Sequence, residues 1–130
     1  MSTRLIQVQA LAYLGTSLAS VFFNVLLFRQ GGTSAVVLYA MMTILVQTMT
    51  FHAAGMWLKQ RPARVLMQVG VLMQALVYGV AVTLGAGASN HLVVLGLLNG
   101  LAGGAYWSGN NLIQCVVTQE RSRSVWFGRQ

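Results

Sequence analysis

Side chains that could do chemistry are sparse in this 130-residue chain and lie far apart in its sequence. The only cysteine is Cys115, so neither an internal disulfide nor a cysteine cluster for a metal can form. His52 and His91 are distant from each other and have no carboxylate near them, because the single acidic residue is Glu120. The sequence contains no phosphate-binding loop and no Ser–His–Asp arrangement. It therefore argues against an enzyme, and we expect neither a metal nor a cofactor.

The most regular polar pattern lies in residues 92–118. At about 100° per helical residue, one side of this segment collects polar side chains: Asn99, Tyr106, Asn110 and Gln114. Amides that face lipid tails would be unsatisfied, so this side is expected to face other helices or a water-filled cavity. Hydrogen bonding between helices would explain one or two such residues, whereas the whole set favours a cavity. The expected lining residues are Asn24, Gln47, Tyr106, Trp107, Asn110 and Asn111.

A second stripe in the same segment consists of small residues at every fourth position: Gly96, Gly100, Gly104 and Ser108. This spacing places them along one line of a helix, where small side chains let a second helix approach closely in lipid. We expect a packing seam within the chain, with a dimer interface as the alternative.

The charge distribution identifies the solvent of these helices. Only 7% of the residues are charged and 56% are hydrophobic, whereas about a quarter of a soluble domain is charged. The charged residues are confined to short stretches: Arg4, Arg29, Lys59, Arg61, Arg64, Glu120, Arg121, Arg123 and Arg129. Uncharged apolar runs of this length are typical of segments that lie in lipid.

The apolar runs predict an all-α integral membrane protein with four transmembrane helices. Each run is close to the roughly 20 residues that a helix needs to cross a bilayer. The expected breaks are glycine-rich or polar stretches at 31–34, 59–62 and 85–91, and Pro62 disfavours helix at the residue before it. The chain then forms a single partial transmembrane domain, followed by a cytoplasmic tail at 119–130. The expected spans are 6–28, 35–58, 65–85 and 92–118.

The basic residues predict the orientation. With four spans, both termini and the middle loop lie on one side of the membrane. That side then holds every basic residue except Arg29. Basic residues concentrate in cytoplasmic loops, so we expect a multi-pass protein of the inner (plasma) membrane with both termini in the cytoplasm. The basic residues are spread over short loops rather than gathered on one face, which argues against a nucleic-acid partner.

The stretch between the second and third expected spans resembles the signature loop of the major facilitator superfamily. That signature begins with Gly and ends in basic residues, and Gly55 and Arg64 match its ends. Lys59 stands where the family has an acid, and Pro62 replaces a second Gly, while Arg61 adds to the basic character.

The segment at 100–107, which ends in Tyr106 and Trp107 and is followed by Asn110 and Asn111, is similar to the glycine-rich fourth helix of bacterial members of that family. The resemblance implies that the chain corresponds to helices 1–4 of an N-terminal six-helix bundle. It also implies alternating access around a central cavity that helices one, two and four line.

The functional expectation is therefore a fragment of a secondary transporter that moves a small solute, whose identity the sequence does not indicate. The expected partners are the lipid bilayer, the solute, and the remaining helices of a longer transporter or an oligomer partner. Two alternatives stay open. The chain could be an autonomous four-helix protein that transports as an oligomer, although the first span lacks the acidic residue that small multidrug resistance proteins use. It could also be a non-transporting assembly subunit.

Overall fold

The computed structural model describes residues 2–119, and nearly all of them are helical. Helix α1 comprises Ser2–Trp57, α2 comprises Ala63–Leu84, and α3 comprises Leu92–Gln119. A seven-residue 3-10 helix, η1, spans Gly85–His91 and joins α2 to α3. The expected cytoplasmic tail, apart from Gln119, lies outside the described residues.

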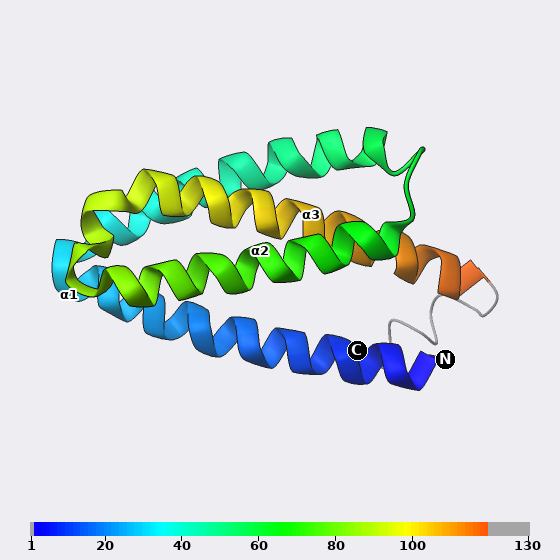
Figure 1. The fold of residues 1–130 in the computed structure, drawn as a ribbon, viewed down its shortest axis with the longest axis horizontal. Coiled ribbons are helices and arrows are strands. Elements are labelled where there is room, and N and C mark those ends of the chain that lie inside the picture. The colour runs from blue at the N-terminus through cyan, green and yellow to red at the C-terminus, as the bar shows by residue number, and fades with distance from the viewer. Residues whose placement is uncertain (1, 120–130) are drawn as a thin grey trace.

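The chain reverses direction inside α1, at Gly32. This residue has φ 67° and ψ −163°, which no helical residue adopts, and two helical segments meet there. Figure 1 shows the first segment running away from the N-terminus and the second running back on the other side of the bundle, with α2 and α3 drawn between the two segments. A backbone with this φ and ψ is essentially restricted to glycine, because a Cβ would clash with the neighbouring peptide.

The prediction of four transmembrane helices is wrong. Within residues 2–119, two helical stretches are long and apolar enough to cross a membrane, Ile6–Trp57 and Ala63–Val116. The expected breaks at 31–34 and 85–91 do not become non-helical loops. Only Gly32 leaves the helical region in the first, and the second folds into η1. Glycine and small polar residues permit a turn, but they do not force the flanking residues out of helical conformation.

In contrast to those two stretches, residues 58–62 form a non-helical connection between α1 and α2. Pro62 precedes the first residue of α2 with φ −66° and ψ 135°, an extended conformation that suits the residue before a helix. In Figure 1 this connection lies at the end of the bundle that also holds the N-terminus of α1, opposite Gly32 and η1.

A single side chain, Gln30, ties the two reversals at the far end together. Its Nε2 donates a hydrogen bond to the carbonyl oxygen of Gly85 at 2.9 Å. Its Oε1 accepts one from the backbone N–H of Ser89 at 3.1 Å. Gln30 therefore fixes η1 against α1, two residues before the kink at Gly32.

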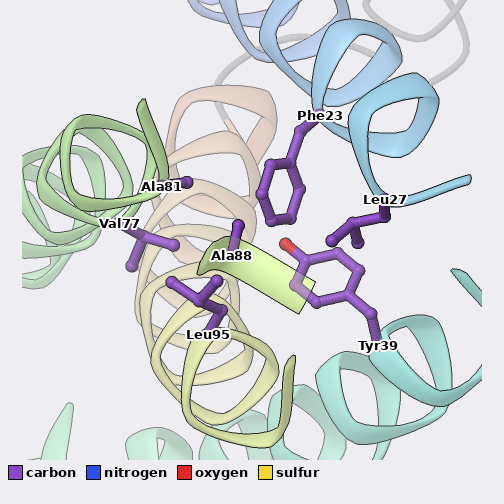
Figure 2. Packing of buried hydrophobic residues seen from close by; sticks show 7 residues of the cluster. All are labelled: Phe23, Leu27, Tyr39, Val77, Ala81, Ala88 and Leu95. Carbon is purple, nitrogen blue, oxygen red and sulfur yellow. The ribbon is translucent and has the colours of Figure 1, made fainter. Parts of the chain in front are cut away.

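Helix α3 is the centre of the fold, since it packs against both α1 and α2, whereas α1 and α2 hardly touch each other. The main apolar cluster at the η1 end joins all four elements, as Figure 2 shows: Phe23, Leu27, Tyr39, Val77, Ala81, Ala88 and Leu95. The rings of Phe23 and Tyr39 meet edge to face with their centroids 4.9 Å apart, a geometry that stabilises aromatic pairs by about 0.5–1.5 kcal/mol.

The outer surface of the helices is strongly apolar. Large hydrophobic side chains such as Phe22, Leu72 and Val82 are 74%, 66% and 79% exposed. A soluble monomer rarely exposes apolar side chains over most of its surface, whereas lipid solvates them well. This surface and the two long apolar stretches indicate a membrane protein.

Candidate functional site

The interior of the bundle contains a row of polar side chains between α1 and α3. At the N-terminal end of α1, Gln9 Nε2 donates a hydrogen bond to Asn110 Oδ1 at 2.6 Å. Gln9 is 4% exposed and Asn110 is fully buried. Asn110 therefore belongs to a closed contact between helices, and its second amide group, Nδ2, has no hydrogen-bond partner within the described residues.

Aromatic side chains surround this amide pair. The rings of Tyr13 and Trp107 lie 5.5 Å apart and join the first segment of α1 to α3. Tyr106 meets Trp107 edge to face at 5.5 Å and is 6% exposed. The backbone of Tyr106 packs directly on Gly70 of α2, where any Cβ would overlap it. Tyr106 thus holds its place because α2 offers no side chain at that position.

A second polar group lies further toward η1, on the other segment of α1. Tyr39 is 6% exposed, and its hydroxyl interacts with the side chains of Thr43 and Asn99. None of the three reaches hydrogen-bonding geometry, so Tyr39 Oη, Thr43 Oγ1 and Asn99 Oδ1 are buried and unpaired within the described chain. Gln47 continues this line one turn on from Thr43, and its Oε1 lies over Gly103 of α3.

Five buried polar atoms in the described part of the chain therefore lack a hydrogen-bond partner: Tyr39 Oη, Thr43 Oγ1, Asn99 Oδ1, Tyr106 Oη and Asn110 Nδ2. Each unpaired buried group costs about 1–3 kcal/mol. All five are neutral, and the set supplies both donors and acceptors. Chemically, the row can hydrogen-bond an uncharged polar molecule, but it offers no charge to pair with an ion.

Not every residue expected in the cavity joins this row. Asn24 is half-buried and its Nδ2 approaches Ser20 Oγ at 3.5 Å, one turn earlier on its own helix. It is 15 residues from Gln9 along α1, which is about 22 Å of helix, so the structure does not bring it to Asn110. Asn111 is exposed, whereas Gln47, Tyr106, Trp107 and Asn110 face the neighbouring helices.

The small-residue stripe of α3 lies against the second segment of α1. A Cβ placed on Gly96 would lie 2.9 Å from the Cβ of Met42, and one on Gly100 would lie 2.7 Å from the carbonyl oxygen of Thr43. A Cβ on Gly104 would lie 2.9 Å from the carbonyl oxygen of Gln47. These contacts lie within one chain and are tighter than ordinary van der Waals contact, so the two helices approach backbone to backbone.

The last member of the small-residue stripe, Ser108, and the residues of the predicted loop motif have simpler surroundings. Ser108 is buried and donates its hydroxyl to the carbonyl oxygen of Gly104 at 2.6 Å, within α3. Gly55 is exposed with open space around it. The basic residues of the loop motif, Lys59, Arg61 and Arg64, are all exposed.

Two grooves open on the surface beside α3. One of about 290 Å³ lies between the first segment of α1 and α2, and Tyr106 and Tyr78 are among its lining residues. A larger one, of about 550 Å³, lies between the second segment of α1, α2 and α3 near the 58–62 connection. Ligand pockets typically measure about 300–1,000 Å³, so the volumes of both grooves approach or reach that range.

Within residues 2–119, no group of three His, Cys, Asp or Glu side chains could hold a metal ion.

Sequence reasoning missed three residues that organise the interior: Gln9, Gln30 and Tyr39. The role of Gln9 could have been predicted in part, because a glutamine near the start of an apolar run requires a hydrogen-bond partner inside the membrane. Gln30 and Tyr39 gave little signal, because both lie beside turns or apolar residues. The partners of Gln30, Gly85 and Ser89, are 55 or more positions away, and Tyr39 approaches Asn99, which is 60 positions away.

Comparison with known proteins gives relatives but no family. No family model matches the chain, and no solved structure matches it. Over 116 residues it is 31% identical to the "Uncharacterized protein in sodM 3'region" of Geobacillus stearothermophilus, a match that covers 88% of this chain and 54% of that protein. Over 125 residues it is 28% identical to the "Uncharacterized protein YqgE" of Bacillus subtilis (strain 168), covering 95% of this chain and 29% of that protein. The chain thus spans about half the length of the first relative and less than a third of the second.

Proposed function

We propose that this chain is a membrane-embedded part of a secondary transporter of the major facilitator type, which moves a small uncharged solute by alternating access. The observation that carries the proposal is the row of five unpaired polar atoms buried between α1 and α3. The interior of a bilayer contains no water that could hydrogen-bond such groups, so packing alone does not account for polar side chains at these positions. A polar solute that passes along the row would pair with them in turn.

The chemistry of the row supports an uncharged solute. Its members are amides and hydroxyls, and the nearest aromatic rings, Tyr13 and Trp107, offer surfaces for stacking. A charged solute would need an opposite charge in the interior, and residues 30–58 and 65–119 contain no Lys, Arg, Asp or Glu. The partial coverage of both relatives supports a working unit larger than this chain.

We also propose that the protein is a multi-pass protein of the inner membrane with both ends of the chain in the cytoplasm. Lys59 and Arg61 lie in the 58–62 connection and Arg64 in the first turn of α2, and Figure 1 shows this connection at the same end of the bundle as the N-terminus of α1, where Arg4 lies. Arg29 instead lies three residues before the reversal at Gly32. The positive-inside tendency then assigns the end with Arg4 to the cytoplasm. Reporter fusions test this orientation: a reporter inserted at Gly87 is expected to be periplasmic and one inserted at Gln60 cytoplasmic. The reverse pattern would overturn it.

A second function, a non-transporting subunit that assembles with other membrane proteins, is favoured by one specific observation. The 2.6 Å contact between Gln9 and Asn110 closes the row at one end and resembles a static contact between helices. In that case the polar atoms would stay dry in every state of the protein.

Thiol labelling separates the two functions. In a Cys115→Ser background, Thr43→Cys and Asn99→Cys place a thiol in the row, and Leu98→Cys places one on the exposed apolar side of α3. For a transporter, a small water-soluble thiol reagent is expected to label the two interior thiols at least several-fold faster than Leu98→Cys. Labelling of the interior sites no faster than the lipid-facing control, in intact membranes, would withdraw the transport proposal.

A further inference from the structure

The larger groove has an apolar body that ends at a polar connection. Its walls come from α1 and α2, with Ala53 and Val69 among them, and Leu101 of α3 contributes to its lining. At the 58–62 end it is bordered by Trp57 and Gln60. Trp57 is 48% exposed, and tryptophan favours the boundary between lipid tails and headgroups. One groove therefore reaches from the apolar interior of a bilayer to its surface.

The 58–62 connection, whose Gln60 borders the groove, and the first turn of α2 carry positive charge that nothing in the described chain neutralises. Lys59, Arg61 and Arg64 are exposed within six positions of one another, and the only acidic residue, Glu120, lies outside the described residues. The N-terminus of α2 adds to this charge. Pro62 provides no side-chain cap and the first turn has no acid, so its free N–H groups and the positive end of the helix dipole face the same place.

Basic residues in the first turn of a helix are unfavourable because they repel its dipole. Arg64 lies in the first turn of α2, and Lys59 and Arg61 precede the helix, so an anion at this N-terminus would compensate both the dipole and these charges. A bare anion would satisfy the charge but leave the apolar groove unexplained. An amphipath with an anionic head and an acyl chain satisfies both, and anionic lipids are a main component of the cytoplasmic leaflet, the side to which these residues are assigned.

We propose that the groove binds an anionic phospholipid, with one acyl chain between α1, α2 and α3 and the phosphate beside Lys59, Arg61 and Arg64. This inference rests on the proposed cytoplasmic position of the 58–62 connection, and it holds whether or not the protein transports a solute. Lipid in this position would also shield the thin contact between α1 and α2.

Quenching of Trp57 fluorescence by brominated lipid tests the proposal. The full chain with Trp107→Phe and Trp126→Phe is reconstituted in vesicles of equal parts phosphatidylglycerol and phosphatidylcholine. The acyl chains of one lipid or of the other are brominated near the headgroup, so the two vesicle types have the same surface charge. We expect brominated phosphatidylglycerol to quench Trp57 several-fold more strongly. Equal quenching by the two lipids would overturn the proposal, as would weak quenching by both, the result expected if protein covers the groove.

Two pairs of variants then distinguish the contribution of the basic residues, which would bind the headgroup, from that of the groove, which would bind the acyl chain. Replacing Lys59, Arg61 and Arg64 together by Gln is expected to abolish most of this several-fold preference, whereas Arg29→Gln should leave it unchanged. Ala53→Leu fills the groove and is expected to reduce quenching by brominated phosphatidylglycerol with the basic residues intact. Ala10→Leu, an equally exposed site outside the groove, is the control. An unchanged preference in Ala53→Leu would show surface attraction alone and overturn the groove site.

Discussion

Gln9 and Asn110 lie 101 positions apart in the sequence, and their side-chain amides are joined by a 2.6 Å hydrogen bond inside the bundle. Because both residues are buried, this bond fixes the register of the first segment of α1 against α3. It also aligns the neighbouring Tyr13–Trp107 contact, which lies one turn later in α1 and one turn earlier in α3. The position of one amide thus determines how two distant parts of the chain fit together.

The two amides of this pair should depend on each other in their contributions to stability. Asn110→Leu removes the acceptor of the hydrogen bond that Gln9 Nε2 donates. Hydrogen bonds between membrane helices are worth only about 0.6 kcal/mol on average and up to about 1.7. We therefore expect a coupling free energy of about 0.6–1.7 kcal/mol in a double-mutant cycle with Gln9→Leu. Unfolding in mixed detergent micelles measures it.

The control for that cycle is Gln7→Leu, the same substitution at an exposed position two residues away. It should show no coupling to Asn110→Leu. A Gln9–Asn110 coupling free energy indistinguishable from zero would mean that the two amides do not depend on each other.

The tight seam on α3 predicts that glycine substitutions differ sharply by position. A Cβ on Gly100 would lie 2.7 Å from both the Thr43 carbonyl oxygen and the Val46 Cβ, so Gly100→Ala must push α1 away. We expect a loss of about 1–3 kcal/mol in the free energy of unfolding. Gly79→Ala, in α2 with open space around it, is expected to be neutral or to stabilise by about 0.5–1 kcal/mol. Equal stability of the two variants in a detergent titration would show that α1 and α3 are not in close contact.

The kink in α1 should depend on Gly32, the residue within 31–34 whose backbone leaves the helical region. Its φ of 67° with ψ of −163° is strained for any residue with a Cβ, because the Cβ meets the adjacent peptide, although beyond the neighbouring residues no atom lies within 4 Å of the added methyl group. Gly32→Ala is therefore expected to cost about 1–3 kcal/mol through backbone strain. Thermal unfolding followed by circular dichroism measures this loss. Gly15→Ala, at a helical glycine with equal space, should cost nothing. If Gly32→Ala were as stable as Gly15→Ala, residue 32 would not have a positive φ in the folded protein.

The hydrogen bonds of Gln30 should protect η1. Gln30→Leu removes the acceptor of the Ser89 N–H and the donor to the Gly85 carbonyl oxygen. We expect amide hydrogen exchange at Ser89 to accelerate by roughly tenfold, because each lost bond is worth about 1 kcal/mol. Gln68→Leu, at an exposed position of α2, should leave the exchange rate unchanged. The same protection of Ser89 in both variants would contradict the role of Gln30.

The sequence was informative where the signal is local and periodic. Helical conformation, apolarity and the four-residue spacing of Gly96, Gly100 and Gly104 can all be read from neighbouring residues. The number of membrane-length helical stretches was not predictable in this way, because glycine at 31 and 32 permits a break without specifying its extent. Contacts between residues that are far apart in the sequence could not be predicted either. The pairing of Gln9 with Asn110 depends on the rotation of two helices, and a one-residue rotation would separate them.

The two bonds of Gln30 have a mechanical consequence. They hold the carbonyl oxygen of Gly85 and the N–H of Ser89 to α1 beside its reversal at Gly32. At the opposite end, the end of α1 and the first turn of α2 are held by a smaller apolar cluster of Ala54, Leu66 and Ala105, which α3 completes. The Gln30 end therefore combines polar and apolar contacts, whereas the 58–62 end depends on apolar packing against α3. A change that weakens apolar packing alone should loosen the 58–62 end before the end that Gln30 holds.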